Sequence, residues 1–349
     1  MIELTIDGLT VTVPQGTTIL EAARTVDIDI PTFCYDRTLG IIGACRMCSV
    51  QIEGVGALKA ACATEVAQGM VVHTESEDVV ETRRILLDLL LSDHPLDCLT
   101  CEKAGACSLQ EYCYRYGVEA TSYEGERKQL QIDDANHLIE RDQNKCILCG
   151  KCVAVCQAVQ ITNAIDFTER GFEATIATSF DHPLSLENCR FCGQCVDLCP
   201  TGALTNKQFK GTRTWERTKV RTTCPFCGVG CNFDLNVANG KVVGATANPE
   251  SPVNTGSLCV KGRFHTDLIN SPDRITTPLI KRDGVFEQAS WDEALDHVAA
   301  RLLDIKDQHG AEALGVLSSA RCTNEENNLL QRLTRAGLNN NSIDHCART

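Results

Sequence analysis

The sequence predicts an α+β chain that is built from several small domains. Apolar residues alternate on both sides of Asp7-Gly8, a strong signal for a β-hairpin at the start of the chain. Most of the 22 cysteines fall in tight groups, with two or three residues between neighbours. One spacing, C-x2-C-x2-C-x3-C, occurs twice, at 146–156 and 189–199. Such groups suit several thiolates that converge on one metal centre. We therefore expect metal-binding domains in series.

Charge and hydropathy narrow the class of protein. The formal net charge of −13 argues against a nucleic-acid partner, because such partners are met by basic surfaces. Residues 1–14 contain no basic segment followed by an apolar one, so no secretory signal is expected. No apolar run has the length of a transmembrane helix. We expect a cytoplasmic protein without a membrane span, in which clustered thiols bind metal instead of pairing as disulfides.

The first module is expected over residues 1–78. After the hairpin, Thr18 and Glu21 predict a capping box and a short helix through Val26. Four cysteines follow, separated by ten, two and thirteen residues: Cys34, Cys45, Cys48 and Cys62. This pattern resembles the [2Fe-2S] ferredoxin-like module of complex I large iron-sulfur subunits, iron-only hydrogenases and NAD-linked formate dehydrogenases. The resemblance implies a β-grasp fold; a zinc site is the alternative, although structural zinc usually takes its ligands as two close pairs.

The second module is expected over residues 79–136. Leucines and isoleucines recur at helical spacing in EDVVETRRILLDLLLSD, which predicts an amphipathic helix. The string after it offers one imidazole and three thiols as ligands: His94, Cys98, Cys101 and Cys107. It resembles the His-ligated [4Fe-4S] motif of the same three families. Cys113 lies outside the spacing, and we expect it to be a small buried hydrophobic residue.

The third module, over residues 137–212, contains the repeated spacing and is the most specific signal in the chain. In bacterial ferredoxins with this run, the fourth cysteine binds the other cluster. The expected crossed sets of ligands are Cys146, Cys149, Cys152 and Cys199 for one [4Fe-4S] centre, and Cys189, Cys192, Cys195 and Cys156 for the other. Gly150 and Gly193 are expected where the backbone passes close to cluster sulfur. The alternating stretch between the repeats predicts an inserted hairpin.

The fourth module is expected over residues 217–275, after a basic linker. Its ligands have the spacing C-x2-C-x3-C, with the last cysteine twenty-seven residues further on: Cys224, Cys227, Cys231 and Cys259. This resembles the cluster-binding first domain of molybdopterin oxidoreductases. In that family a lysine two residues after the last cysteine lies between the cluster and the pterin, and Lys261 matches it. The alternative is that Lys261 is an ordinary solvated lysine.

Residues 276–349 resemble the incomplete start of a molybdopterin-binding α/β domain. Ser290 is a plausible N-cap of a long amphipathic helix, and the segment from Ala313 to Gly337 predicts strand, loop and helix. The resemblance implies a bis-molybdopterin guanine dinucleotide with molybdenum or tungsten in the full-length protein. It also implies that the loop contacts this cofactor through Ser318, Ser319, Arg321, Thr323 and Asn324. An ordinary strand-to-helix loop is the alternative for each of them.

The final stretch, NNSIDHCART, resembles the segment of formate dehydrogenases that precedes the selenocysteine or cysteine ligand of the metal. The resemblance implies that this ligand would follow Thr349. It also suggests that the reading frame was ended at a UGA selenocysteine codon. On this interpretation no catalytic residue lies within the chain, and the 349 residues alone are not expected to oxidise formate.

The resemblance as a whole implies the iron-sulfur portion of a formate dehydrogenase, with one [2Fe-2S] and four [4Fe-4S] clusters that pass electrons from formate oxidation to a partner. A flavin- and NAD-binding diaphorase-type subunit, a ferredoxin or a hydrogenase subunit could be that partner, since no nicotinamide or flavin fingerprint is found. Three other classes of protein are alternatives. An iron-only hydrogenase does not account for the Cys224 set, a complex I subunit lacks the double repeat, and a non-enzymatic electron carrier has no use for Lys261.

Overall fold

The hairpin predicted around Asp7-Gly8 is present and opens a mixed five-stranded sheet. The computed structural model describes residues 1–185 and 188–346. The strands are β1 (Ile2–Ile6), β2 (Leu9–Val13), β3 (Ser49–Ile52), β4 (Lys59–Ala60) and β5 (Val71–His73), in the order β2-β1-β5-β3-β4. β1 runs antiparallel to β2 and parallel to β5. Asp7 and Gly8 have φ of 48° and 84°, as a two-residue hairpin turn requires.

Helix α1 (Ile19–Arg24) covers the buried face of this sheet, and its apolar side chains share one core with Leu4, Ile6 and Val72. The Thr18 hydroxyl caps the helix by accepting from the Glu21 amide at 3.3 Å. The helix ends at Arg24, two residues before the predicted end at Val26. The Glu21 carboxylate accepts from the Tyr35 hydroxyl and pairs with Arg24 and Arg37, so it serves tertiary packing.

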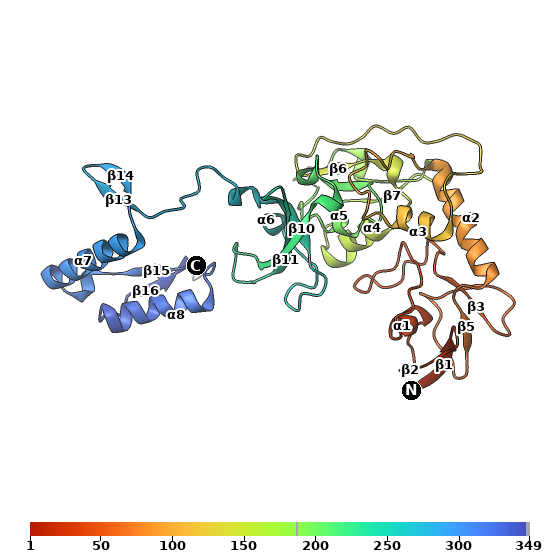
Figure 1. Ribbon diagram of the computed structural model, residues 1–349, viewed down its shortest axis with the longest axis horizontal. Coiled ribbons are helices and arrows are strands. Elements are labelled where there is room, and N and C mark those ends of the chain that lie inside the picture. Colours follow the sequence, from red (N-terminus) through yellow and green to blue (C-terminus); the bar gives the residue numbers. More distant parts are fainter. Residues whose placement is uncertain (186–187, 347–349) are drawn as a thin grey trace. The chain divides into compact units, whose positions relative to one another are not determined.

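The same N-terminal unit, Met1–Thr218, continues with the predicted amphipathic helix α2 (Glu77–Asp93) and with α3 (Ser108–Tyr116). Leu87 and Leu91 of α2 pack with Leu109 and Tyr116 of α3. Figure 1 shows α2 in orange, and this helix contacts β3 of the first sheet. Cys113 of α3 is buried in this core, as expected.

The repeated cysteine segment forms two short helices framed by two small ladders. They are α4 (Lys151–Ala154), α5 (Gln194–Leu198), β6 (Ile139–Arg141) paired with β9 (Leu204–Asn206), and β7 (Asp166–Thr168) paired with β8 (Thr175–Ala177). The β7–β8 pair is the predicted inserted hairpin. Short 3-10 or π turns lie at Gln143–Lys145, Val155–Val159, Gly171–Glu173, Ser179–Asp181, Lys207–Phe209 and Thr214–Glu216.

The second unit, Lys219–Thr349, begins within β10 (Thr218–Thr223), so part of the predicted linker is a strand. Its other elements are β11 (Asn232–Ala238), β12 (Lys241–Ala247), α6 (Val260–Phe264), β13 (Leu279–Arg282), β14 (Val285–Gln288), α7 (Trp291–His309), β15 (Val316–Ser318), α8 (Asn324–Arg332) and β16 (Ile343–His345), with short turns at Asp267–Ile269, Ala311–Ala313 and Leu333–Gly337. Ser290 caps α7 as predicted, because its hydroxyl accepts from the Glu293 amide at 3.2 Å. Residues 347–349 of the stretch NNSIDHCART lie outside the described residues.

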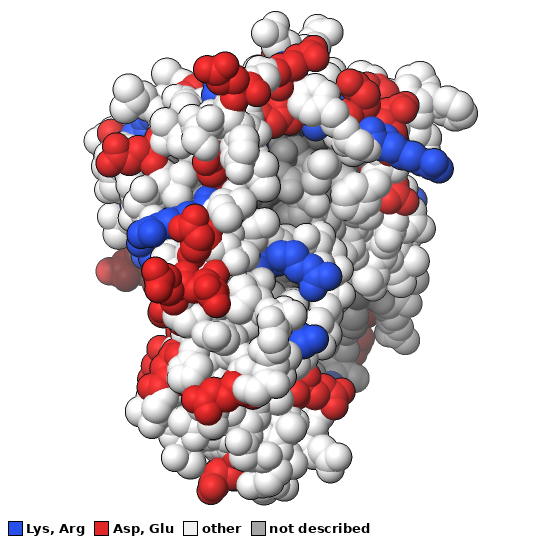
Figure 2. Space-filling view, turned by 90° about the vertical axis from the view of Figure 1, so that its right-hand side faces the viewer, with Lys and Arg blue, Asp and Glu red and all other residues white. Residues whose placement is uncertain are grey.

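The surface is acidic, in line with the net charge of −13. Figure 2 shows acidic side chains spread over the face it draws, with basic side chains between them. In the described part of the chain, no helix combines the length and the apolarity that crossing a bilayer would need.

Candidate iron-sulfur centres and pterin loop

The four cysteines of the first set lie in two touching pairs beside the sheet. Cys34 and Cys45 form one pair: the hydrogen bond between their thiols raises the pKa of Cys34 and lowers that of Cys45 to about 5. The same kind of bond lowers the pKa of Cys48 to about 7 and raises that of Cys62. The amide of Phe33 also donates to Cys45 Sγ at 3.4 Å. In each pair, therefore, one thiol ionises more readily and its partner less readily than a free cysteine.

His94 ends helix α2 as its C-cap, and its side chain is buried. Its Nδ1 atom is buried and has no hydrogen-bond partner among the described residues. Burial lowers the pKa of His94, which keeps the imidazole neutral and able to coordinate metal. An unpartnered buried nitrogen is costly unless something binds it, so this atom fits the role of a ligand.

The three cysteines that follow His94 are close enough to influence one another. Burial raises the pKa of the Cys98 and Cys107 thiols, and the nearby Cys101 raises both further. Cys98 is exposed, whereas Cys101 and Cys107 are half-buried. Cys107 is the N-cap residue of α3. The structure thus gathers these thiols at the junction between α2 and α3.

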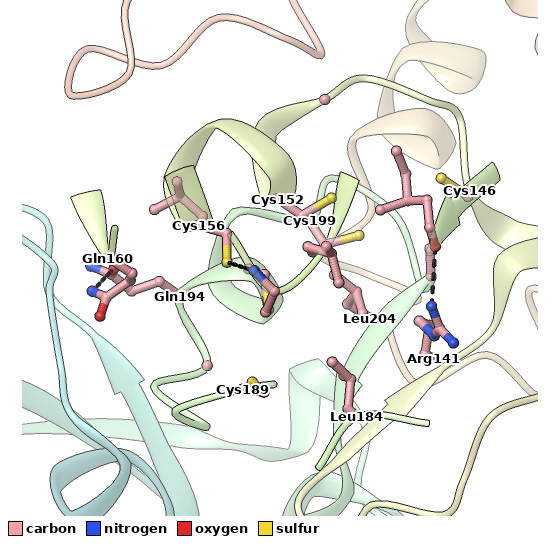
Figure 3. A pocket seen from close by; sticks show the side chains of 18 of the residues that line it. Arg141, Cys146, Cys152, Cys156, Gln160, Leu184, Cys189, Gln194, Cys199 and Leu204 are labelled. Carbon is pink, nitrogen blue, oxygen red and sulfur yellow. Dashed lines mark hydrogen bonds between the residues drawn. The ribbon is translucent and has the colours of Figure 1, made fainter. Parts of the chain in front are cut away.

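A cavity in the repeat segment is lined by all eight of its cysteines. Its volume is about 50 Å³. Its remaining walls are largely apolar, with Ile165, Ile176, Leu184 and Leu204 among them. Figure 3 shows the sulfurs of Cys152 and Cys199 side by side, with Cys189 across the cavity. Among the described residues, no three His, Cys, Asp or Glu side chains gather closely enough to hold a single metal ion.

Thiols of the two repeats act on one another across this cavity. Burial raises the pKa of Cys146 to about 11 and that of Cys149 to about 12, and the charge of Cys199 raises each further. Burial also raises the pKa of Cys152, and the charges of Cys199 and Cys195 raise it further. Burial raises the pKa of Cys189, and the charges of Cys192 and Cys156 raise it further. Buried thiols in such proximity ionise readily only when metal cations offset their charge, so this lining suits bound metal.

The two repeats also share an unusual backbone. Leu148 and Phe191, at the same place in each repeat, have φ of 52° and 50°, a region that few residues other than glycine adopt. Their amides donate to the preceding cysteines, Leu148 to Cys146 Sγ at 3.5 Å and Phe191 to Cys189 Sγ at 3.3 Å. These N–H groups point at cysteine sulfur, where they favour negative charge on the sulfur.

Gly150 and Gly193 also occupy the same place in each repeat. At Gly150, however, the neighbours of the expected β-carbon position are apolar side chains and not cysteine sulfur. Both have positive φ, 78° and 70°, and both precede a helix. A β-carbon on Gly150 would first meet the Phe167 ring at 3.3 Å and Ile42 at 3.4 Å, not a sulfur. The glycine is therefore needed for its conformation and for the packing of the inserted hairpin.

The fifth set lies at one end of the β10–β12 sheet. Burial raises the pKa of Cys224, and Cys231, Cys259 and Cys227 each raise it further, so the four thiols are neighbours. The Cys224 amide donates to the Cys231 carbonyl at 2.8 Å. Cys259 caps α6, and Lys261 lies exposed in the first turn of this helix. A β-carbon on Gly262 would lie 3.5 Å from Cys224 Sγ, which brings the helix close to the sulfurs.

The loop predicted to contact a pterin joins β15 to α8 and borders a hollow of about 550 Å³. Ser318 and Ser319 line this hollow; Arg321, Thr323 and Asn324 do not. Thr323 is engaged in a capping box with Glu326, which explains why its hydroxyl turns to the helix. Asn327, Gln331, Asp344 and His345 line the hollow and were missed, because their part in it depends on the parallel pairing of β15 with β16.

The same loop is linked to the fifth cysteine set. A β-carbon on Gly228, the residue after Cys227, would lie 2.8 Å from the Ala320 carbonyl oxygen. Only glycine allows this approach of the cysteine loop to the loop of Ser319 and Arg321.

Families of known proteins match the chain along nearly its whole length. A 2Fe-2S iron-sulfur cluster binding domain matches residues 1–77, and the NADH-ubiquinone oxidoreductase-G iron-sulfur binding region matches residues 83–122. A 4Fe-4S dicluster domain matches 145–203, the molybdopterin oxidoreductase Fe4S4 domain matches 217–271, and molybdopterin oxidoreductase matches 274–349. The matches support 2Fe-2S and 4Fe-4S domains followed by the start of a molybdopterin domain. Iron-sulfur and molybdopterin cofactors are thereby supported.

Curated relatives are similar over essentially the whole chain. The NADPH-Fe(3+) oxidoreductase subunit alpha of Geobacter sulfurreducens is 43% identical over 100% of this chain and 40% of its own length. A subunit of an NADH-quinone oxidoreductase of Rhizobium meliloti is 39% identical with the same coverage. A provisionally named formate dehydrogenase of Staphylococcus haemolyticus is 31% identical over 99% of this chain and 39% of its own length. The chain thus spans about 40% of the length of these relatives.

A solved structure supports the fold. A chain in the crystal structure of an NAD+-reducing [NiFe]-hydrogenase in the H2-reduced state superposes with a TM-score of 0.54 at 30% identity. The likeness covers 61% of this chain and 89% of that one.

Proposed function

We propose that this chain is the electron-transfer portion of a molybdopterin-dependent oxidoreductase and holds five iron-sulfur clusters. The observation that carries the proposal is the cavity lined by the eight cysteines of the repeat segment. A [2Fe-2S] cluster would be held by the Cys34, Cys45, Cys48 and Cys62 set. Four [4Fe-4S] clusters would be held by the His94 set, the two crossed sets and the Cys224 set. When bound, such clusters take up and release single electrons.

The protein's own residues set the conditions for this chemistry. Apolar walls around the eight cysteines limit water, and amides such as those of Leu148 and Phe191 donate to ligand sulfur. The neutral imidazole of His94 replaces one thiolate, which makes that ligand set less negative than the others. Lys261, two residues after Cys259, is our candidate for the residue between the last cluster and the pterin.

For the substrate we propose formate, which would be oxidised to CO2 by the full-length protein. The support is the resemblance of NNSIDHCART to formate dehydrogenases together with the relative provisionally named for that activity. The relatives named for NADPH and NADH favour a flavin- and NAD(P)-binding subunit as the partner; ferredoxin and a hydrogenase subunit are the other partners we consider.

A second candidate is an iron-sulfur subunit that carries electrons for a hydrogenase and has no catalysis of its own. The likeness to a chain of an NAD+-reducing [NiFe]-hydrogenase favours it. The pterin loop that contacts the cysteine loop at Gly228 favours the oxidoreductase, because a pure carrier has no need of this contact.

Metal analysis of the protein translated from the complete gene separates the two. The oxidoreductase should contain molybdenum or tungsten and reduce a viologen dye with formate. A product that contains neither metal, with its clusters intact, would support the carrier. A product that contains molybdenum or tungsten but reduces the dye with NADPH and not with formate would support the oxidoreductase and reject formate as its substrate.

A further inference from the structure

Lys145 precedes Cys146 in the first repeat, yet its side chain runs to a different cysteine set. Its Nζ atom lies 3.1 Å from Asp97 Oδ2 and 3.1 Å from Asp142 Oδ2, and the side chain is 14% exposed. Asp97 belongs to the His94 string, between His94 and Cys98. The Asp97 carbonyl accepts from the Cys101 amide at 3.0 Å. The Lys145 ammonium group therefore binds the residue that directly precedes Cys98, a proposed ligand far from Lys145 in the sequence.

The backbone and stem of Lys145 are fixed as well. The Thr201 hydroxyl donates to the Lys145 carbonyl at 2.7 Å, and the Lys145 amide donates to the Asp142 carbonyl at 3.2 Å. A β-carbon on Gly202 would lie 3.3 Å from Lys145 Cδ and 2.8 Å from Cys101 Sγ. The lysine stem and the sulfur thus meet at the same glycine. If the side chain moved into solvent, it would lose its ion pairs with Asp97 and Asp142 and its packing against Gly202.

Electrostatics agree with this geometry. Burial alone would lower the pKa of Lys145. The hydrogen bonds to Asp97 and Asp142 and the charge of Cys101 have a larger, opposite effect, so the pKa of Lys145 is raised. A fixed positive charge near a cluster stabilises the reduced form, which carries one more negative charge.

We propose that Lys145 is a positioning residue that raises the reduction potential of the cluster held by His94, Cys98, Cys101 and Cys107, with Asp97 as its opposing charge. The inference rests on the proposed function, because it requires a cluster at this set. It assigns to one segment of the ferredoxin repeat a role in the neighbouring centre.

The test is a redox titration of the 349-residue chain followed by electron paramagnetic resonance. The signal that disappears in Cys101→Ser identifies the His94-set cluster. In Lys145→Gln this signal should titrate at a more negative potential, while the [2Fe-2S] signal in the same sample keeps its potential and serves as the internal control. Lys145→Arg should stay at the wild-type value. Asp97→Asn should shift in the opposite, positive direction.

The outcomes are distinct. Unchanged potentials in Lys145→Gln and Asp97→Asn, with full iron content, would overturn the role of Lys145. Equal shifts of all the clusters would overturn it too, since that pattern reports a change in overall charge. If Lys145→Gln loses the cluster, the reduction potential in Asp97→Asn becomes the test: a positive shift supports the role of Lys145, and an unchanged potential overturns it. A wild-type chain without the His94-set signal would instead reject the proposed function.

Discussion

Gly202 and Cys101 touch across two modules of the chain: a β-carbon on Gly202 would lie 2.8 Å from Cys101 Sγ. We predict that Gly202→Ala displaces this sulfur and weakens the His94-set cluster, because the crowding involves a proposed ligand. The cost in stability should be about 1–3 kcal/mol, as for other overpacked sites. Iron content and anaerobic urea unfolding would measure both effects. Gly125→Ala is the control, since nothing lies within 4 Å of its β-carbon position; equal behaviour of the two variants would contradict the contact.

Arg83 holds the loop of the first set from inside the protein. Its fully buried guanidinium donates to the carbonyls of Met47 and Ser49, on either side of Cys48, and to the Tyr116 hydroxyl. Arg83→Leu should cost about 2–4 kcal/mol, because several buried acceptors lose their partner, and should loosen the [2Fe-2S] site. Thermal unfolding and the visible absorption of this cluster would show it. The control is Arg84, the exposed residue next to Arg83. Arg84→Leu should change the unfolding temperature and the cluster absorption far less.

Cys156 and Cys113 are both cysteines on short helical segments, but we expect opposite consequences of replacing them. Cys156→Ala should lose the iron of the cluster held with Cys189, Cys192 and Cys195, because the fourth ligand comes from the other repeat. Cys113→Ala should keep all iron and cost about 1 kcal/mol from the small cavity it leaves. Iron analysis decides; loss of the Cys146-set signal in Cys156→Ala would mean that the ligands are not crossed.

Removing the iron should loosen the two parts of the N-terminal unit unequally. The sheet β1–β5 has a continuous apolar core around Leu4, Ile6 and Val72, whereas the repeat segment surrounds a cavity lined by eight thiols. After chelation under reducing conditions, hydrogen exchange should become fast over residues 146–199 and remain slow in β1 and β2. Uniform loss of protection would show that the first sheet also depends on metal.

The sequence was sufficient wherever a feature depends on near neighbours. The spacing of the repeats predicted which cysteines would gather, because a C-x2-C-x2-C run can turn only a few ways around one centre. The hairpin at Asp7-Gly8, the Thr18 and Ser290 caps and the β7–β8 hairpin also follow from local rules. The helix end at Arg24 was misplaced by two residues because Asp27, with φ of 59°, turns the chain early.

Contacts between distant segments were not predictable in this way. Nothing in the sequence around Gly202 indicates Cys101, and Lys145 gives no sign that its ammonium reaches Asp97 instead of solvent. The residues of the hollow beside the β15–α8 loop were only partly found, because Asp344 and His345 join it through β16. These are tertiary effects, and they are the features that tune a site after its ligands are chosen.

The most direct test of the account is iron quantification with Mössbauer spectroscopy on the anaerobically purified 349-residue chain. One [2Fe-2S] and four [4Fe-4S] clusters would give about eighteen irons per chain, with spectral components of both cluster types. Zinc in place of iron, or an iron content that leaves the eight-cysteine cavity with fewer than two clusters, would contradict it.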